Sequence, residues 1–221
     1  MEDNYKIETI LNIFTVVNGE LNILLIKRQD EPYKGYWELP SMIMHHDELL
    51  MDSVCLAMEK RAYLPSDAFI SCNQGYVFDA LDRKVDERVI GVTYNCIIDS
   101  RVADERKLPL GLDEVEWFAV SSLPKLAYDH QSIVYKALNS LKMKILYEDG
   151  LRELFPSDFT LPELQRVYEI ITGNKCDRRN FRKKLLDQDL LEDTGYKTEG
   201  SQGRPAKLYR FKDNIEFLEV I

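Results

Sequence analysis

Long apolar runs are missing from this sequence of 221 residues. No stretch approaches the roughly 18 consecutive apolar residues that a membrane-spanning helix needs. The opening residues, MEDNYKIETI, contain neither a basic region nor an apolar core, so we expect no signal peptide. These absences predict a cytoplasmic protein that does not associate with a membrane.

Cysteine and histidine are scarce. The four cysteines are scattered, and no two of them have C-x-x-C spacing. Zinc ribbons need that close spacing, and disulfide frameworks belong to small secreted domains. His45 and His46 are adjacent, so their side chains point apart, and only His130 lies elsewhere. We therefore expect reduced thiols and no metal site.

Positive charge is low overall but unevenly distributed. The net charge is −9, and residues 1–150 carry 16 Lys/Arg against 25 Asp/Glu. Residues 151–221 balance at 13 of each, but residues 175–212 contain 11 basic and 6 acidic residues, a local excess of 11 − 6 = +5. An acidic first part and a basic patch behind it predict two domains with different partners. We place the boundary between residues 149 and 150, in a stretch that holds Gly150 and Pro156.

Residues 35–64, GYWELPSMIMHHDELLMDSVCLAMEKRAYL, have the residue spacing of a known motif but lack most of the carboxylates of that motif. An aromatic-Leu-Pro strand end leads to an acid, Glu48, and then to an apolar stripe at helical spacing. This order resembles the Nudix box, G-x5-E-x7-R-E-U-x-E-E-x-G-U, in which U is a bulky aliphatic residue. With Glu48 as the first acid, Leu56 and Ala57 take the Arg-Glu positions, and Lys60 and Arg61 take the Glu-Glu positions.

The missing carboxylates bear on catalysis. Hard divalent ions need several carboxylate oxygens at one spot, and two cations there would repel Mg²⁺. Moving the frame by one residue to use Glu59 puts Cys55 and Leu56 at the Arg-Glu positions and still leaves Lys60 at an acid position. We therefore predict no catalytic residue, no metal and no cofactor, and we expect Glu48 to cap the helix start.

The rest of the first domain reads as strands around one helix. Residues 10–17 and 21–27 are apolar runs joined by Asn18-Gly19, which favours a type I′ hairpin. A helix over residues 128–147, with Asp129 as its N-cap, would close the domain. Further strands are predicted at residues 74–78, 89–98 and 116–120.

The pattern changes in the second domain. Thr160 and Glu163 form a T-x-x-E capping box, and Gly173 would end the helix that starts there. Asp177 would cap a second, basic helix, and residues 195–211 read as a hairpin with a glycine-rich basic tip. This order is typical of a winged helix-turn-helix. The fold class is therefore α+β, with an N-terminal Nudix-like α/β/α sandwich over residues 1–149 and a winged helix-turn-helix domain over residues 150–221.

The segments FTLPELQ, YEIITG, DRRNFRKK and GRPAKLYRF, behind a decayed Nudix box, resemble the Nudix-related transcriptional regulators of NrtR type. The resemblance implies a homodimeric repressor that binds double-stranded operator DNA. It also implies a small-molecule effector in the Nudix-like domain, because several members bind ADP-ribose and control NAD metabolism, while relatives control sugar utilisation. The chain has Ser41-Met42 where many members keep Gly-Gly, so ADP-ribose-like and sugar effectors both stay open.

Two sets of site residues follow. The basic helix and the wing would contact DNA, although a solvated charged face and an ordinary hairpin turn are the alternatives. The effector set collects cations suited to a diphosphate, one box acid and one histidine. Arg83 and Arg88 could instead pair with Asp82, Asp86 and Glu87, and His130 could serve capping or a domain interface. The predicted DNA-binding residues are Arg178, Arg179, Asn180, Arg182, Lys183, Lys184, Arg204 and Lys207. The predicted effector-binding residues are Arg28, Glu48, Arg83, Arg88 and His130.

Two other functions compete with the repressor. One is a Nudix pyrophosphohydrolase acting on ADP-ribose or a related nucleoside diphosphate derivative, which Lys60 and Arg61 argue against. The other is an interaction protein whose winged helix binds protein, which would lack the salt dependence of phosphate binding.

Overall fold

The computed structural model describes residues 5–84, 87–104, 114–147, 150–198 and 205–212. The chain divides into two compact units, one made of residues 1–15 and 22–137 and the other of residues 16–21 and 138–221. The predicted domain boundary between residues 149 and 150 stays a prediction. Over the described ranges, none of the helices combines the length and the apolar character that crossing a bilayer requires.

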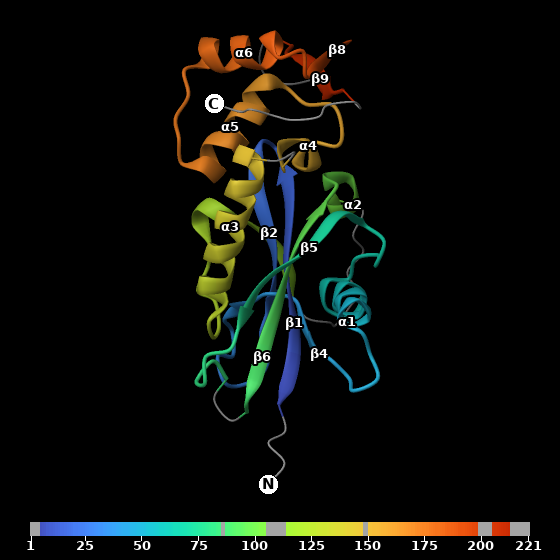
Figure 1. Ribbon diagram of the computed structural model, residues 1–221, viewed down its shortest axis with the longest axis vertical. Coiled ribbons are helices and arrows are strands. Elements are labelled where there is room, and N and C mark those ends of the chain that lie inside the picture. Colours follow the sequence, from blue (N-terminus) through green and yellow to red (C-terminus); the bar gives the residue numbers. More distant parts are fainter. Residues whose placement is uncertain (1–4, 85–86, 105–113, 148–149, 199–204, 213–221) are drawn as a thin grey trace. The chain divides into compact units, whose positions relative to one another are not determined.

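A mixed sheet forms the centre of the first unit (Figure 1), with the strand order β3-β2-β1-β6-β5. Strands β1 and β6 run parallel, and β4 and β7 add to β1 and β2 at the sides of this path. All the predicted strands of this unit are present. The bounds are β1 (Lys6–Val17), β2 (Glu20–Lys27), β3 (Trp37–Glu38), β4 (Ser41–Ile43), β5 (Phe69–Phe78), β6 (Val89–Ile98) and β7 (Val115–Ala119).

The turn between β1 and β2 confirms the predicted hairpin. Asn18 and Gly19 have φ angles of 52° and 69°. A type I′ turn needs positive φ at both central residues, and asparagine and glycine tolerate that conformation best.

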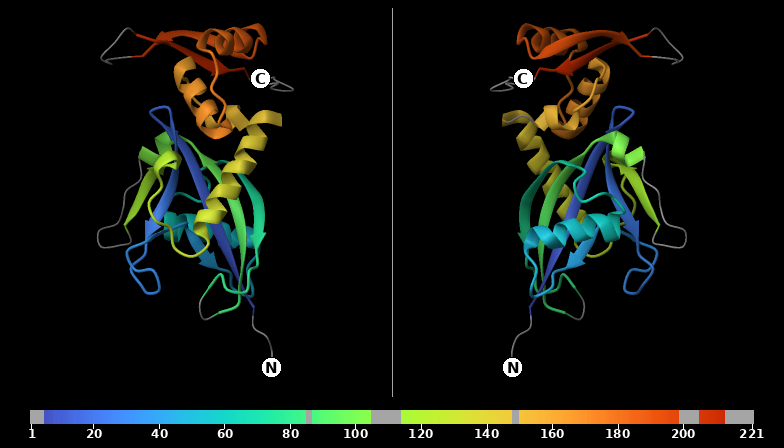
Figure 2. Two further views of the ribbon diagram at one scale, coloured as in Figure 1. Left: turned by 90° about the vertical axis from the view of Figure 1, so that its left-hand side faces the viewer. Right: turned by 90° about the vertical axis from the view of Figure 1, so that its right-hand side faces the viewer.

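Helices cover both faces of the sheet, as Figure 2 shows from opposite sides. The box helix α1 (Leu50–Ala57) packs on one face, and the first half of α3 (His130–Tyr147) packs on the other. The helical spacing in the sequence suggested that α-helix would continue past Ala57. Instead α1 is followed by a π-helical turn, η1 (Met58–Ala62). The N–H of Tyr63 donates to the carbonyl of Met58, five residues back. Two short elements complete the unit, α2 (Ser100–Asp104) and the 3₁₀ turn η2 (Val120–Ser122).

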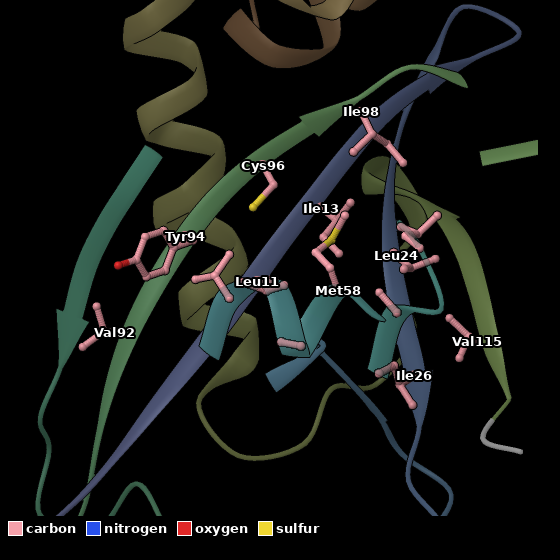
Figure 3. Packing of buried hydrophobic residues seen from close by; sticks show 14 residues of the cluster. Leu11, Ile13, Leu24, Ile26, Met58, Val92, Tyr94, Cys96, Ile98 and Val115 are labelled. Atoms are coloured by element: carbon pink, nitrogen blue, oxygen red, sulfur yellow. The ribbon is translucent and has the colours of Figure 1, made fainter. Parts of the chain in front are cut away.

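The main core lies between the sheet and α1 (Figure 3). Val54, Ala57 and Met58 have no exposed surface, which confirms the apolar stripe predicted for the box helix. They meet Leu11 and Leu24 of the sheet in one cluster. Each fully buried Val, Leu or Met side chain contributes roughly 1.5–3 kcal/mol, so this contact fixes where the box lies on the sheet.

The second unit contains α4 (Gly150–Leu154) and α5 (Leu161–Thr172). The predicted capping box is confirmed, because the Thr160 hydroxyl accepts from Glu163 N–H at 3.3 Å and the Glu163 carboxylate accepts from Thr160 N–H at 2.8 Å. Gly173 ends α5 with a φ of 73°. The residues buried along α5 are Leu161, Leu164, Val167, Tyr168, Ile171 and Thr172.

Helix α6 (Arg178–Asp187) and the hairpin of β8 (Leu191–Lys197) and β9 (Lys207–Phe211) follow. The carboxylate of Asp177 caps α6 by accepting from the N–H groups of Arg179 and Asn180. The first hairpin strand begins at Leu191, four residues earlier than predicted, because Leu191 pairs with Phe211 across the hairpin. The order of two helices and a hairpin is that of a winged helix-turn-helix.

Candidate functional site

The two Glu-Glu positions of the Nudix box carry cations here, Lys60 and Arg61. Lys60 is exposed, and the guanidinium of Arg61 donates to Glu38 Oε1 at 3.1 Å. Across the described ranges, no three side chains among His, Cys, Asp and Glu gather closely enough to hold a metal ion. The residues at the box positions therefore do not fit the divalent metal that the box binds in enzymes. Tyr63 stands at the second glycine position of the box and has a φ of 53°. The backbone there is left-handed, a conformation that glycine adopts most easily, although the residue is a tyrosine.

The prediction that Glu48 caps the start of α1 is wrong. Its carboxylate accepts from the N–H of His45 at 2.9 Å, within the preceding loop. Asp52 takes the capping position instead, because its carboxylate accepts from Leu49 N–H at 3.0 Å. A carboxylate three residues into the helix reaches back to this N–H more easily than one that precedes the helix.

A buried ion network lies between the start of β1 and the start of α3. The guanidinium of Arg83 donates to Glu8 at 3.0 Å and to both oxygens of Asp129 at 3.0 and 3.2 Å. Lys84 Nζ lies 3.2 Å from the other oxygen of Glu8, which also accepts from the Ser41 hydroxyl at 2.9 Å. Burial alone would raise the pKa of Glu8, but Lys84 and Arg83 outweigh it and the pKa lies below its usual value.

Arg83 differs from the expectation that it meets the effector directly. Its side chain is 1% exposed, and its partners are Glu8 and Asp129 rather than the neighbouring acids considered from the sequence. Asp129 precedes α3 as predicted, and its carbonyl accepts from Ile133 N–H at 3.1 Å, but its carboxylate faces Arg83. Gly91 makes the room, because a Cβ there would lie 2.9 Å from Arg83 Nη2.

His130 has no exposed surface. Its Nδ1 accepts a hydrogen bond from Leu39 N–H at 2.9 Å, so the proton of the neutral ring is on Nε2, which has no hydrogen-bond partner among the described residues. Burial lowers the pKa of His130 to about 4. The ring is therefore neutral at pH 7 and holds the Leu39 end of the box loop.

Arg28 and Arg88 are tied to the protein itself. Arg28 donates to Glu38 and to the carbonyl of Pro32 at 3.0 Å. Arg88 donates to the carbonyls of Asp79 and Ala80 at 2.7 and 3.2 Å. Arg28 lies close to the buried network through Tyr128, whereas the contacts of Arg88 hold the end of the β5–β6 loop.

An aromatic cluster beside the network was not anticipated from the sequence. Tyr33 contacts Tyr36 and Tyr128, with ring centroids 5.6 and 4.9 Å apart. The guanidinium of Arg28 lies 4.9 Å and the ammonium of Lys84 lies 3.8 Å from the centre of the Tyr128 ring. Tyr33 and Tyr36 are 39% and 37% exposed, so the cluster offers aromatic surface next to two cations. Tyr33 and Tyr128 adopt positive φ, which residue type alone does not reveal.

The outer face of α6 is a cationic surface. All six predicted contact residues of this helix are exposed, while Phe181 and Leu185 are 1% exposed and anchor its inner face. Among the residues that the structure describes, no acid forms an ion pair with any of the five cations. Those cations are Arg178, Arg179, Arg182, Lys183 and Lys184.

The cations of the wing are placed differently. Lys207 Nζ lies 2.6 Å from Asp193 across the hairpin, which raises the pKa of Lys207. The charge of Arg182 acts on the same pKa in the opposite direction. Arg204 lies outside the described residues, and its contact with DNA stays a prediction.

Comparison with known proteins follows the same division of the chain. A family model described as the NrtR DNA-binding winged helix domain matches residues 151–211. The ADPR responsive transcriptional repressor NtrR of Acinetobacter baylyi is 32% identical over 203 residues, which covers 90% of this chain and 79% of that protein. The chain belongs to the NrtR family.

Other similarities agree with this family and point to its enzymatic relatives. A crystal structure of Shewanella oneidensis NrtR bound to a 27mer DNA has a TM-score of 0.74 at 27% identity and covers 93% of both chains. An ADP-ribose pyrophosphatase of Methanocaldococcus jannaschii is 30% identical over 120 residues, 54% of this chain and 67% of the enzyme. A structure of the NUDIX domain of Shewanella oneidensis NrtR with ADP ribose has the same fold as the matched part of this chain, with a TM-score of 0.54 at 19% identity over 62% of this chain and 89% of that one. The NrtR architecture thus joins a Nudix domain to a winged helix.

Proposed function

We propose that this NrtR-family chain is a homodimeric, cytoplasmic transcriptional repressor that binds operator DNA through α6 and responds to ADP-ribose. One observation carries the proposal. Helix α6 presents five exposed cations without ion-pair partners among the described residues, inside the segment that matches the NrtR winged helix. Cations that have no protein partner can displace counterions from phosphates, which is the main source of affinity for DNA.

The two faces of α6 have different tasks in this proposal. Phe181 and Leu185 hold the helix against α5, where the rings of Phe181 and Tyr168 are 5.5 Å apart. The outer face then enters a groove, where an arginine can bond two acceptors of a guanine, and the other arginines and the lysines contact phosphates. A dimer would place two such helices on half-sites of a pseudo-palindrome.

We place the effector at the aromatic cluster of Tyr33, Tyr36 and Tyr128. The exposed rings of Tyr33 and Tyr36 suit stacking on a nucleobase, and Arg28 and Lys84 supply positive charge for a diphosphate. The name of the Acinetobacter relative supports ADP-ribose over a sugar. Among the predicted effector residues, we place Arg28 in direct contact with the effector. Arg83 and His130 are buried and support the site through their contacts with Glu8, Asp129 and Leu39.

The DNA side of the proposal is tested by salt dependence. Binding to the chain's own upstream DNA is measured by fluorescence anisotropy at several salt concentrations. Removing one phosphate contact with Arg182→Ala should weaken binding and reduce the salt slope by about one. Lys125→Ala, at an exposed lysine of the first unit, is the matched control and should change neither. An unchanged slope for Arg182→Ala would favour a winged helix that binds protein.

The pyrophosphatase relative makes hydrolysis the second candidate function. Lys60 and Arg61 at the Glu-Glu positions, with Arg61 bound to Glu38, argue against it. Incubation of the full chain with ADP-ribose and Mg²⁺ or Mn²⁺ should release no AMP above background. Sustained metal-dependent release of AMP would overturn the non-enzymatic function.

A further inference from the structure

Two thiols face each other across neighbouring strands of the first unit. Cys72 of β5 is directly opposite Cys96 of β6, and their Sγ atoms are 3.3 Å apart. The pairing is regular from Ser71 to Gln74, between two irregular steps in the register. A disulfide has an S–S length of about 2.05 Å, so the sulfurs need to approach by only about 1.2 Å. Opposed Cα atoms of antiparallel strands, about 4.5–5.5 Å apart, already lie within the range of disulfides.

The two thiols have different surroundings. Cys96 has no exposed surface and points into the main core (Figure 3), whereas Cys72 is half-buried at the edge of the same cluster. A hydrogen bond from the Cys96 thiol lowers the pKa of Cys72, while burial raises the pKa of Cys96 well above its usual value. Cys72 is therefore the thiol that an oxidant reaches first and that ionises first.

We propose that Cys72 and Cys96 form an oxidation site at which hydrogen peroxide produces a cross-strand disulfide. The Cys72 thiolate attacks one peroxide oxygen, the O–O bond breaks, and sulfenic acid and hydroxide form. The Cys96 thiol then attacks the Cys72 sulfur, the S–O bond breaks, and water leaves with the Cys96 proton. In total two thiols lose two electrons to one peroxide, which is reduced to two water molecules.

The remaining cysteines are poorer candidates. Cys55 lies on α1, and its pKa is raised, mainly by burial and secondly by the charge of Cys72. Cys176 belongs to the second unit. Strand β5 has β6 as its only neighbour in the described sheet, so the disulfide would fasten an edge strand to the rest of the sheet. Disulfides in reducing compartments are usually transient and redox-sensing, which fits a pair that the fold keeps close but reduced.

The test is oxidation of the full chain by hydrogen peroxide. Thiols titrated in denaturant should fall from the four of the sequence to two, the mass should fall by about 2 Da, and dithiothreitol should reverse both changes. Peptide mapping should join Cys72 to Cys96. The double variant Cys55→Ala/Cys176→Ala keeps the pair and should lose both of its thiols.

A trapping variant distinguishes the two roles. In Cys96→Ala the sulfenic acid on Cys72 cannot be resolved within the pair and should be labelled by dimedone, whereas Cys72→Ala should show no such label on Cys96. If the core substitution at Cys96 prevents folding, the Cys72→Ala variant still tests the proposal through the absence of a label on Cys96. Survival of four thiols, a peptide linking Cys72 to Cys55, or a disulfide-linked dimer would each overturn the proposal.

Discussion

At the residue scale, His130 and its neighbours govern how the first unit responds to acid. The ring is fully buried and accepts from Leu39 N–H, and its pKa falls from 6.5 to about 4 in the folded chain. Between these values the unfolded chain binds one more proton than the folded chain. The stability that the neutral ring provides is therefore fully present above pH 6.5 and is lost as the pH falls toward 4.

The free energy of unfolding should fall by up to about 1.4 kcal/mol per pH unit in this window, and by about 3 kcal/mol across it. Urea unfolding followed by tryptophan fluorescence measures this, because Trp37 and Trp117 both lie in the first unit. His130→Asn keeps an acceptor for Leu39 N–H and should remove most of the slope between pH 6.5 and 5. His46→Asn, at a side chain that is 95% exposed, should retain it. Equal slopes in the two variants would contradict this account of His130.

Gly91 is a second single-residue prediction. A Cβ at this position would lie 2.9 Å from both Arg83 Nη2 and Ile10 Cδ1. Gly91→Ala should therefore destabilise the first unit by about 1–3 kcal/mol, as overpacking does. Ile10→Val removes one of the two clashing atoms, so the double variant should be more stable than the sum of the single changes predicts. Strict additivity in urea unfolding would show that the clash is not the cause.

At the scale of elements, the capping box of α5 gives the cleanest expectation. Thr160→Ala removes the acceptor for Glu163 N–H and should cost about 1 kcal/mol. Amide hydrogen exchange in α5 measures this locally, and protection should fall at the first turn of the helix. Thr160→Ser keeps the hydroxyl and serves as the control. Equal losses in both variants would mean that the methyl group of Thr160, rather than the cap, stabilises the helix.

The elements also show how far the sequence could predict the structure. The Asn18-Gly19 turn, the α5 capping box and the Asp177 cap are local signals, because each depends on a few adjacent residues. The π turn after Ala57 could not be foreseen, since it depends on how Tyr63 closes onto Met58 against the core. Which carboxylate caps α1, Asp52 or Glu48, likewise depends on the backbone geometry at the start of the helix, and the residue types alone do not determine it.

The candidate site was less predictable than the elements. Arg28, Arg83 and His130 were predicted to bind the effector, but the partners of Arg83 and His130 come from distant segments. Glu8 lies 75 residues before Arg83, and Leu39 lies 91 residues before His130. No local pattern records such pairings. The sequence places Tyr33 and Tyr36 close together in QDEPYKGYW, but Tyr128 comes from a distant segment, so the cluster could not be read from one stretch.

At the scale of the whole molecule, two units carry two different surfaces. The first unit has the aromatic surface of Tyr33 and Tyr36 beside Arg28 and Lys84, and the second has the cationic face of α6. An effector can change DNA binding only by its difference in affinity between the DNA-competent and incompetent states. Coupling of the usual size, about 1–3 kcal/mol, corresponds to a change in operator affinity of about 5- to 150-fold.

The measurement that tests this most directly is operator binding by the full chain, titrated at fixed salt with ADP-ribose, NAD and a pentose. The account predicts that ADP-ribose shifts operator affinity at least about fivefold. Tyr36→Ala should bind DNA normally but lose most of that shift, and Tyr5→Ala, at a tyrosine that is 60% exposed, should keep it. An operator affinity that is unchanged at saturating ADP-ribose, or that responds to the pentose alone, would contradict the account.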